Sequence, residues 1–159
     1  EPAMSTGVRD RAPALVAPPA ATERRPVMLI SLDVGFDETA VAFAIESALE
    51  AGTELLVTLA VTLPTGNANA AARRTMGDPV VREQMQEILR QAHAAGATAR
   101  QLVYNSPRPI IALYGVIESH AIGLLVFGPA RRPYGRWRFR WHLRRIKRNA
   151  ACLVWPLEA

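Results

Sequence analysis

Short, nearly continuous apolar runs alternate along this chain with longer segments that carry apolar residues at helical spacing. The runs at 27–32, 55–61, 98–104, 123–127 and 151–155 have the length and composition of buried strands. A strand that is apolar on both faces needs helices on both sides of its sheet. The order therefore predicts an α/β fold, a doubly wound parallel sheet of five strands joined by right-handed crossovers.

The helices between these strands have recognisable starts and stops. Asp37 is expected to cap a helix that ends before Gly52, and Asp78-Pro79 and Ser106-Pro107 are expected to open two more. The residues predicted to face the core are Val41, Ile45, Ala48 and Leu49, then Val81, Met85, Ile88, Ala92 and Ala95, then Ile110, Leu113, Tyr114 and Ile117.

Composition narrows the class of protein further. Residues 1–26 are rich in proline and alanine without apolar periodicity, so we expect a flexible arm before one domain at 27–159. The single cysteine, Cys152, excludes a disulfide scaffold. The most apolar window, 110–130, is interrupted by Glu118 and His120, and no charged segment followed by an apolar one opens the chain. A cytoplasmic protein is the expectation.

Positive charge is concentrated near the C-terminus. The chain has 19 Lys/Arg and 14 Asp/Glu, and nine of the basic residues, with no acid, lie between Arg131 and Arg148. The rest has ten basic residues against 14 acidic ones, so the sequence describes a mildly acidic body with one cationic strip.

Helical spacing divides this strip into two faces. Phe139, Leu143, Ile146 and Ala150 form the expected core face, and the residues expected to bind a partner are Arg136, Trp137, Arg138, Trp141, Arg145 and Arg148. A surface that alternates tryptophan with arginine is suited to binding an acidic protein. Nucleic acid and an anionic membrane are the other possible partners. The alternative is that the tryptophans pack on their own domain and the arginines stay solvated.

Polar residues follow the ends of several predicted strands. In doubly wound sheets, ligands bind beyond the carboxyl ends of the strands, where the strand order switches. Asp33, the residues after Val61 and the loop after Gly128 should therefore lie near one crevice. This argument locates a site without naming its ligand.

Several segments, taken in order, resemble the universal stress protein family over residues 26–156. They are Leu29-Ile30-Ser31-Leu32-Asp33, Ala51-Gly52-Thr53-Glu54-Leu55, Ala95-Gly96-Ala97, Leu124-Leu125-Val126-Phe127-Gly128 and Ala150-Ala151-Cys152-Leu153-Val154. The resemblance implies the strand order 3-2-1-4-5 and a homodimer formed through the fifth strand. It places Cys152, Val154 and Trp155 at that dimer interface, the alternative for Trp155 being that it covers the core of its own domain.

The resemblance also implies a test for nucleotide binding. Family members that bind ATP carry a glycine, two residues, a glycine, nine residues, and then glycine with serine or threonine. Here Gly128 matches the first glycine, but Arg131 stands at the second, and the final pair falls at Arg140-Trp141 or one position later, at Trp141-His142. Large side chains there would obstruct a phosphate cradle, although guanidinium groups can hold phosphate oxygens. The residues assigned to a nucleotide by resemblance are Asp33, Val61, Gly128, Arg131 and Arg132. For Asp33 the alternative is that its carboxylate caps the loop or helix that follows the first strand.

These observations leave two main hypotheses. The first is a non-catalytic, dimeric binding protein of the universal stress type that docks on a protein partner through the basic-aromatic strip. The second is an adenine-nucleotide sensor with a modified phosphate site. No cofactor is expected under the first hypothesis, and under the second it would be ATP or another adenine nucleotide. No nucleophile elbow is present, the three histidines lack metal-site spacing, and Cys152 is expected to be packed, so no catalytic or metal residue is assigned.

Overall fold

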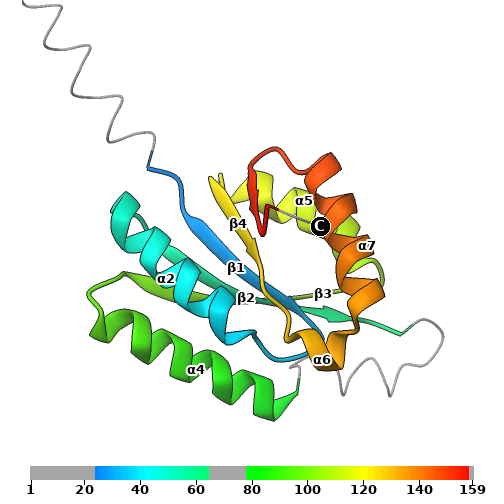
Figure 1. Cartoon of the computed structure of the whole chain (residues 1–159), viewed down its shortest axis with the longest axis horizontal. Coiled ribbons are helices and arrows are strands. Elements are labelled where there is room, and N and C mark those ends of the chain that lie inside the picture. Colours follow the sequence, from blue (N-terminus) through cyan, green and yellow to red (C-terminus); the bar gives the residue numbers. More distant parts are fainter. Residues whose placement is uncertain (1–23, 65–77, 158–159) are drawn as a thin grey trace, which may run out of the picture.

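The computed structural model describes residues 24–64 and 78–157. Its sheet has five parallel strands in the order β3-β2-β1-β4-β5 (Figure 1). They are β1 (Val27–Leu32), β2 (Leu55–Thr62), β3 (Ala99–Ser106), β4 (Leu124–Phe127) and β5 (Leu153–Trp155). The predicted fold class and strand order are confirmed.

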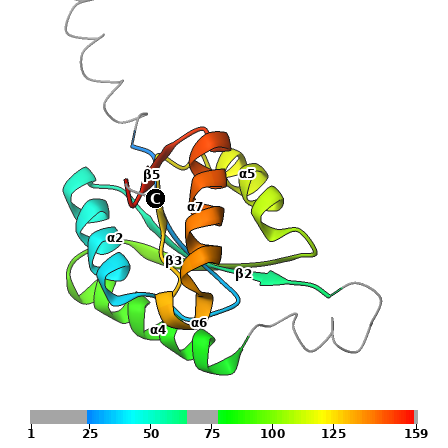
Figure 2. The ribbon, with the colours of Figure 1, turned by 45° about the vertical axis from the view of Figure 1, so that its right-hand side comes forward.

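Helices cover both faces of the sheet. One face carries α2 (Glu38–Ala51) and α4 (Pro79–Ala94), and the other carries α5 (Pro109–Ser119) and α7 (Arg136–Asn149), as Figures 1 and 2 both show. A single turn, α6 (Arg131–Tyr134), connects β4 to α7. The strands separate two apolar cores because alternate side chains point to opposite faces: Leu29 packs toward α2, and Met28 and Ile30 toward α5 and α7.

The predicted helix starts are confirmed at two of three positions. The Asp37 carboxylate accepts a hydrogen bond from Ala40 N, and the Asp78 carboxylate accepts one from Val80 N. The third start is wrong: α5 begins at Pro109, and Ser106 still belongs to β3, where its Oγ accepts a hydrogen bond from Arg108 N. The second proline of Pro107-Arg108-Pro109 occupies the first turn, which suits its fixed φ.

Two of the predicted core residues lie elsewhere. Leu49 is exposed, and Ala95 is the exposed cap that follows α4, whereas Ile45 and Tyr114 are half-buried and pack against the two cores. In α2 the buried stripe is Ala40, Val41, Ala44 and Ala48, so small residues bring this helix close to the sheet. The predicted flexible arm lies almost wholly outside the described residues, as does 65–77 of the segment between β2 and α4. Within the described ranges, no helix has the length and apolar character needed to span a bilayer.

Candidate functional site: two basic grooves beside α7

Backbone hydrogen bonds close the gap between the carboxyl ends of β1 and β4. Asp37 N donates to Gly128 O at 2.9 Å, and Ala130 N donates to Gly35 O at 2.8 Å. Gly128 N donates to Ile30 O. These amides are therefore already engaged within the protein and do not point at a ligand.

Gly128 has a packing role in this arrangement. A Cβ added at Gly128 would lie 2.6 Å from Ala40 Cβ and 2.9 Å from Leu29 Cδ1. The glycine thus allows α2 to approach the end of β4, which accounts for its presence without a phosphate.

Asp33 connects the ends of β1 and β2. Its Oδ1 accepts a hydrogen bond from Thr62 N at 2.8 Å, and its Oδ2 accepts one from Thr62 Oγ1 at 2.5 Å. The residue has φ 62°, a left-handed conformation that aspartate tolerates better than most residues. Arg138 Nη2 lies 3.8 Å from Oδ2. The carboxylate predicted to meet a nucleotide is thus bonded to its own fold.

Tyr134 occupies the space between the end of β4 and α7. It is buried, contacts Phe127 edge-on, and its hydroxyl hydrogen-bonds to His142 Nδ1. The Arg138 guanidinium lies over its ring, 4.3 Å from the centroid. Burial raises the pKa of Tyr134, and burial together with Arg138 and Arg145 lowers the pKa of His142. Both pKa shifts favour the uncharged forms of the two side chains in this hydrogen bond.

The last positions of the ATP-binding motif fall inside a helix. Because α7 begins at Arg136, Arg140 and Trp141 lie in its second turn, where backbone amides are bonded within the helix. Gly135 and Arg136 stand at the helix N-terminus instead. A glycine thus caps α7, but an arginine follows it where the motif has serine or threonine, so no hydroxyl side chain stands at this helix N-terminus.

A first groove, which we call the α5–α7 pocket, lies beyond the ends of β1 and β2. Its volume is about 560 Å³, and it combines three guanidinium groups with apolar walls. It is lined by Leu32, Thr62, Arg108, Pro109, Ile110, Ile111, Arg138, His142 and Arg145. Arg108 was missed by the sequence analysis because only the fold brings the start of α5 beside α7.

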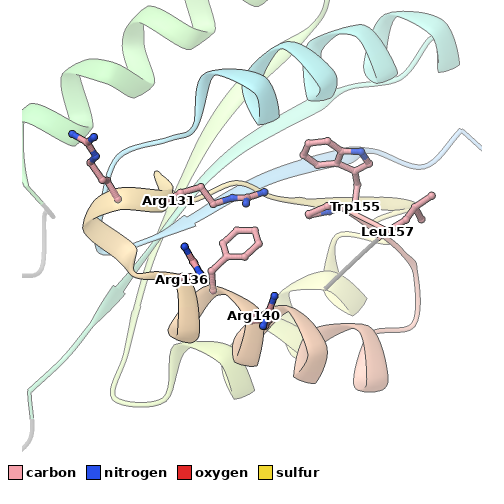
Figure 3. A pocket seen from close by; sticks show the side chains of 8 residues that line it. Arg131, Arg136, Arg140, Trp155 and Leu157 are labelled. Carbon is pink, nitrogen blue, oxygen red and sulfur yellow. The ribbon is translucent and has the colours of Figure 1, made fainter.

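A second groove, which we call the β5 groove, lies on the other side of α7. Its volume is about 920 Å³, and it is lined by Arg131, Arg132, Arg136, Phe139, Arg140, Trp155, Pro156 and Leu157. Figure 3 shows arginines from α6 and α7 facing Trp155 and Leu157, which lie at and after β5. The predicted nucleotide residues are therefore divided: Arg131 and Arg132 line this groove, Asp33 lies beside Thr62 of the other pocket, and Val61 is buried in the sheet.

The two tryptophans of α7 project from the surface between these grooves. Trp137 is 79% exposed and Trp141 is 61% exposed. The alternative in which they pack on their own domain is therefore wrong. Phe139, Leu143 and Ile146 form the predicted core face, and Ala150 follows the helix as a half-buried cap. Of the predicted partner residues, Arg148 shares the exposed surface, Arg138 and Arg145 line the α5–α7 pocket, and Arg136 lines the β5 groove.

The residues predicted for a dimer interface lie on the edge strand. Val154 is buried within the domain, and the Trp155 ring stacks on Phe43 with 4.5 Å between centroids. Cys152 is half-buried, and burial raises the pKa of its thiol. The most exposed apolar residue of β5 is Leu153, at 73%. Leu153 was not among the residues predicted for this interface; strand alternation with Val154 inward is the signal that could have found it.

Comparison with solved structures shows which known fold this architecture matches. A universal stress protein from Archaeoglobus fulgidus, in complex with dAMP, superposes with a TM-score of 0.58 at 13% sequence identity, covering 82% of this chain and 94% of that one. The chain has the universal stress protein fold. A universal stress protein in complex with cAMP superposes with a TM-score of 0.53 at 19% identity, covering 82% of this chain and 93% of that chain.

Comparison of the sequence with known proteins does not assign the chain to a family. No family model matches the chain, and no curated protein matches it. An AMP-bound family protein from Arabidopsis thaliana has a TM-score of 0.50 at 12% identity, with 82% of this chain and 88% of that one covered. The universal stress protein fold is thus present at sequence identities that reveal fold and not function. Across the described ranges, no group of three or more His, Cys, Asp or Glu residues could hold a metal ion.

Proposed function

We propose that this chain is a non-catalytic binding protein that docks on an acidic protein partner through the exposed tryptophan face of α7. The observation that carries the proposal is the exposure of Trp137 and Trp141 one helical turn apart. Monomeric proteins rarely leave two indoles in water, and tryptophan is enriched among the residues that dominate binding energy.

The surroundings of the two tryptophans favour an acidic partner. Arg144 and Arg148 are exposed on the same helix, and the Arg145 guanidinium lies 5.8 Å from the centre of the Trp141 ring. The first turn of α7 contains no acid. Carboxylates on a partner would therefore meet arginine around an apolar centre, which is the usual anatomy of a specific interface.

The proposal includes a homodimer. The free edge of β5 carries the exposed Leu153, and the side of the strand that faces the domain is occupied by Val154. An unpaired strand edge beside an exposed leucine is a ready surface for a second copy. This surface is separate from the tryptophan face, so one dimer would present two docking sites.

Replacing both tryptophans by alanine is expected to weaken partner binding at least 30-fold, because each indole buried in an interface contributes about 2 kcal/mol. The partner recovered with the wild-type chain is purified and titrated by calorimetry against wild type and Trp137→Ala/Trp141→Ala. Val80→Ala is the control, since Val80 is 76% exposed on α4, far from α7. Unchanged affinity of the double variant contradicts the proposal, and indole-dependent binding of an oligonucleotide or an anionic vesicle instead selects another partner class.

A second candidate function is adenine-nucleotide binding in the α5–α7 pocket. Solved structures with this fold bind dAMP, cAMP and AMP. The pocket lies at the carboxyl ends of the strands, offers apolar walls for a base, and has three arginines for phosphate. Its volume of about 560 Å³ is within the usual range for small-molecule sites.

Calorimetry with ATP, ADP, AMP and cyclic dinucleotides tests this candidate. We expect micromolar binding that falls at least tenfold in Arg108→Ala/Arg145→Ala, because both guanidinium groups line the pocket. Arg144→Ala/Arg148→Ala removes the same charge from the same surface and should bind normally. Heat changes that are absent for every nucleotide, or equal losses in both double variants, contradict a site in this pocket.

A further inference from the structure

We infer that the partner of α7 contributes a single acidic helix, which packs antiparallel along α7. This inference rests on the proposed docking function and specifies the form of its partner. The contact would be made by Trp137, Trp141, Arg144 and Arg148, which we call the α7 seam. All four are exposed, and their spacing of four, three and four residues is the spacing at which one helix packs along another.

The α7 seam lies on the side of the helix that faces away from its own domain. Phe139, Leu143 and Ile146 are buried against the sheet, and at about 100° per residue the seam lies opposite them. Figures 1 and 2 show no other described helix or strand outside α7 on that side. A solvent-facing side normally carries polar residues. Here it carries two indoles, and the whole of α7 contains no acid.

The surface of α7 favours a helical partner over an extended one. A helix offers only side chains to a partner, because its backbone N–H and C=O groups are bonded within it. Extended peptides bind at free strand edges, where their own backbone groups find partners. A peptide laid on α7 would bury part of its backbone without such bonds. A partner helix satisfies its own backbone, and its side chains repeat along the axis at the same rises of about 6.0 and 4.5 Å.

The seam differs along its length, and this difference sets the direction of the partner. Its first half is indole, from Trp137 and Trp141, and its second half is guanidinium, from Arg144 and Arg148. The partner helix therefore needs apolar residues against the tryptophans and carboxylates against the arginines. Carboxylates stabilise a helix near its own N-terminus. An antiparallel partner places them there, opposite the last turns of α7, whereas a parallel partner would place them at its C-terminus.

The arginines of the seam need negative charge from outside the helix. Arg140, Arg144 and Arg148 follow one another at intervals of four residues, and like charges at this interval weaken a helix. Neither Arg144 nor Arg148 makes an ion pair with any residue that the structure describes. The α7 helices of two copies would repel each other, and α7 on another surface of a second copy would not close into a dimer. We therefore assign the acidic helix to a different protein.

The arrangement of the seam also separates this partner from the other classes. Single-stranded nucleic acid binds in a cationic groove that contains aromatic platforms, but neither groove beside α7 is lined by Trp137 or Trp141. A membrane-binding helix separates an apolar face from a cationic one along its whole length. On α7, Arg144 and Arg148 continue the same row as the tryptophans. The row therefore matches a partner that is apolar at one end and acidic at the other.

Titration of the full chain with a designed helical peptide tests the inference. The peptide has glutamate at the contact positions of its N-terminal half and leucine at those of its C-terminal half, and circular dichroism verifies its helicity. We expect saturable binding that weakens at least tenfold in Trp137→Ala/Trp141→Ala and in Arg144→Glu/Arg148→Glu. Replacing the peptide's glutamates by lysines should restore binding to Arg144→Glu/Arg148→Glu, a rescue that an unfolded variant could not give.

Matched controls keep charge and composition but change the position of the residues. Arg90→Glu/Arg100→Glu alters the net charge by the same amount on α4 and β3, away from α7, and should bind the peptide normally. A peptide with the same residues distributed evenly around its helix should bind at least tenfold more weakly. A peptide with its two halves exchanged should also bind more weakly. Equal binding by either altered peptide, or no binding by any, overturns the inference.

These outcomes are separable from failure of the docking proposal. If the native partner needs Trp137 and Trp141 but the designed peptide does not bind, docking stands and the helical form of the partner is wrong. Seam-dependent binding of an oligonucleotide or an anionic vesicle that is tighter than binding of the peptide also overturns the inference. Analytical ultracentrifugation tests the remaining occupant: assembly beyond a dimer that Arg144→Glu/Arg148→Glu abolishes would show that a second copy occupies the seam, and would contradict a different protein.

Discussion

Replacing Gly128 by alanine is expected to lower the free energy of unfolding by about 3 kcal/mol, near the upper end of the cost of overpacking a core. The added Cβ would lie 2.6 Å from Ala40 Cβ and 2.9 Å from Leu29 Cδ1. The Cβ of Ala40 cannot move without displacing α2, and Leu29 is fully buried, so its Cδ1 has little room to turn away. Urea denaturation measures the loss, with an unchanged slope indicating the same cooperative transition.

Gly115→Ala is the matched control. Gly115 is exposed in the middle of α5, and a Cβ added there meets no atom within 4 Å. The same chemical change should therefore stabilise the protein, by up to about 1 kcal/mol, through helix propensity alone. A Gly128→Ala protein as stable as the wild type would contradict the packing role. That result would instead favour the ligand-binding role that the motif implies for Gly128.

The contrast between these glycines explains how far the sequence predicted the site. Apolar runs and helical periodicity predicted the sheet, because burial on both faces leaves few alternatives. The Gly128 motif position was equally visible, but its function was not. Whether a glycine admits a phosphate or a helix depends on which atoms face it, and α2 lies almost 90 residues earlier in the chain.

The cationic strip also shows that a sequence pattern does not predict contacts with residues far away in the chain. Helical spacing correctly separated a buried face at Phe139, Leu143 and Ile146 from an exposed one. It treated the arginines as one surface, whereas the fold divides them between two grooves on opposite sides of α7. That division is made by Arg108 on α5 and Trp155 on β5. Both residues come from other parts of the chain, so the spacing of residues within the strip cannot predict that they lie beside it.

Asp33 tests whether a predicted ligand contact is in fact part of the fold. Asp33→Ala is expected to lower the free energy of unfolding by about 2–4 kcal/mol. Two hydrogen bonds to a carboxylate are lost, and Thr62 N is left without its acceptor at the end of β2. Alanine is also less suited than aspartate to φ 62°. The ion pair with Arg138, at 3.8 Å and partly exposed, contributes little to this loss.

Asp33→Asn separates these causes. Asparagine tolerates the left-handed conformation, and its Oδ1 can still accept from Thr62 N, so we expect a loss of about 1 kcal/mol. Urea denaturation of both variants is followed by nucleotide titration of whichever remains folded. If Asp33→Ala is as stable as wild type yet no longer binds an adenine nucleotide, the carboxylate serves the ligand. If stability falls in the order wild type, Asn, Ala, the carboxylate holds the ends of β1 and β2 together. Any nucleotide in the α5–α7 pocket must then be bound chiefly by the arginines.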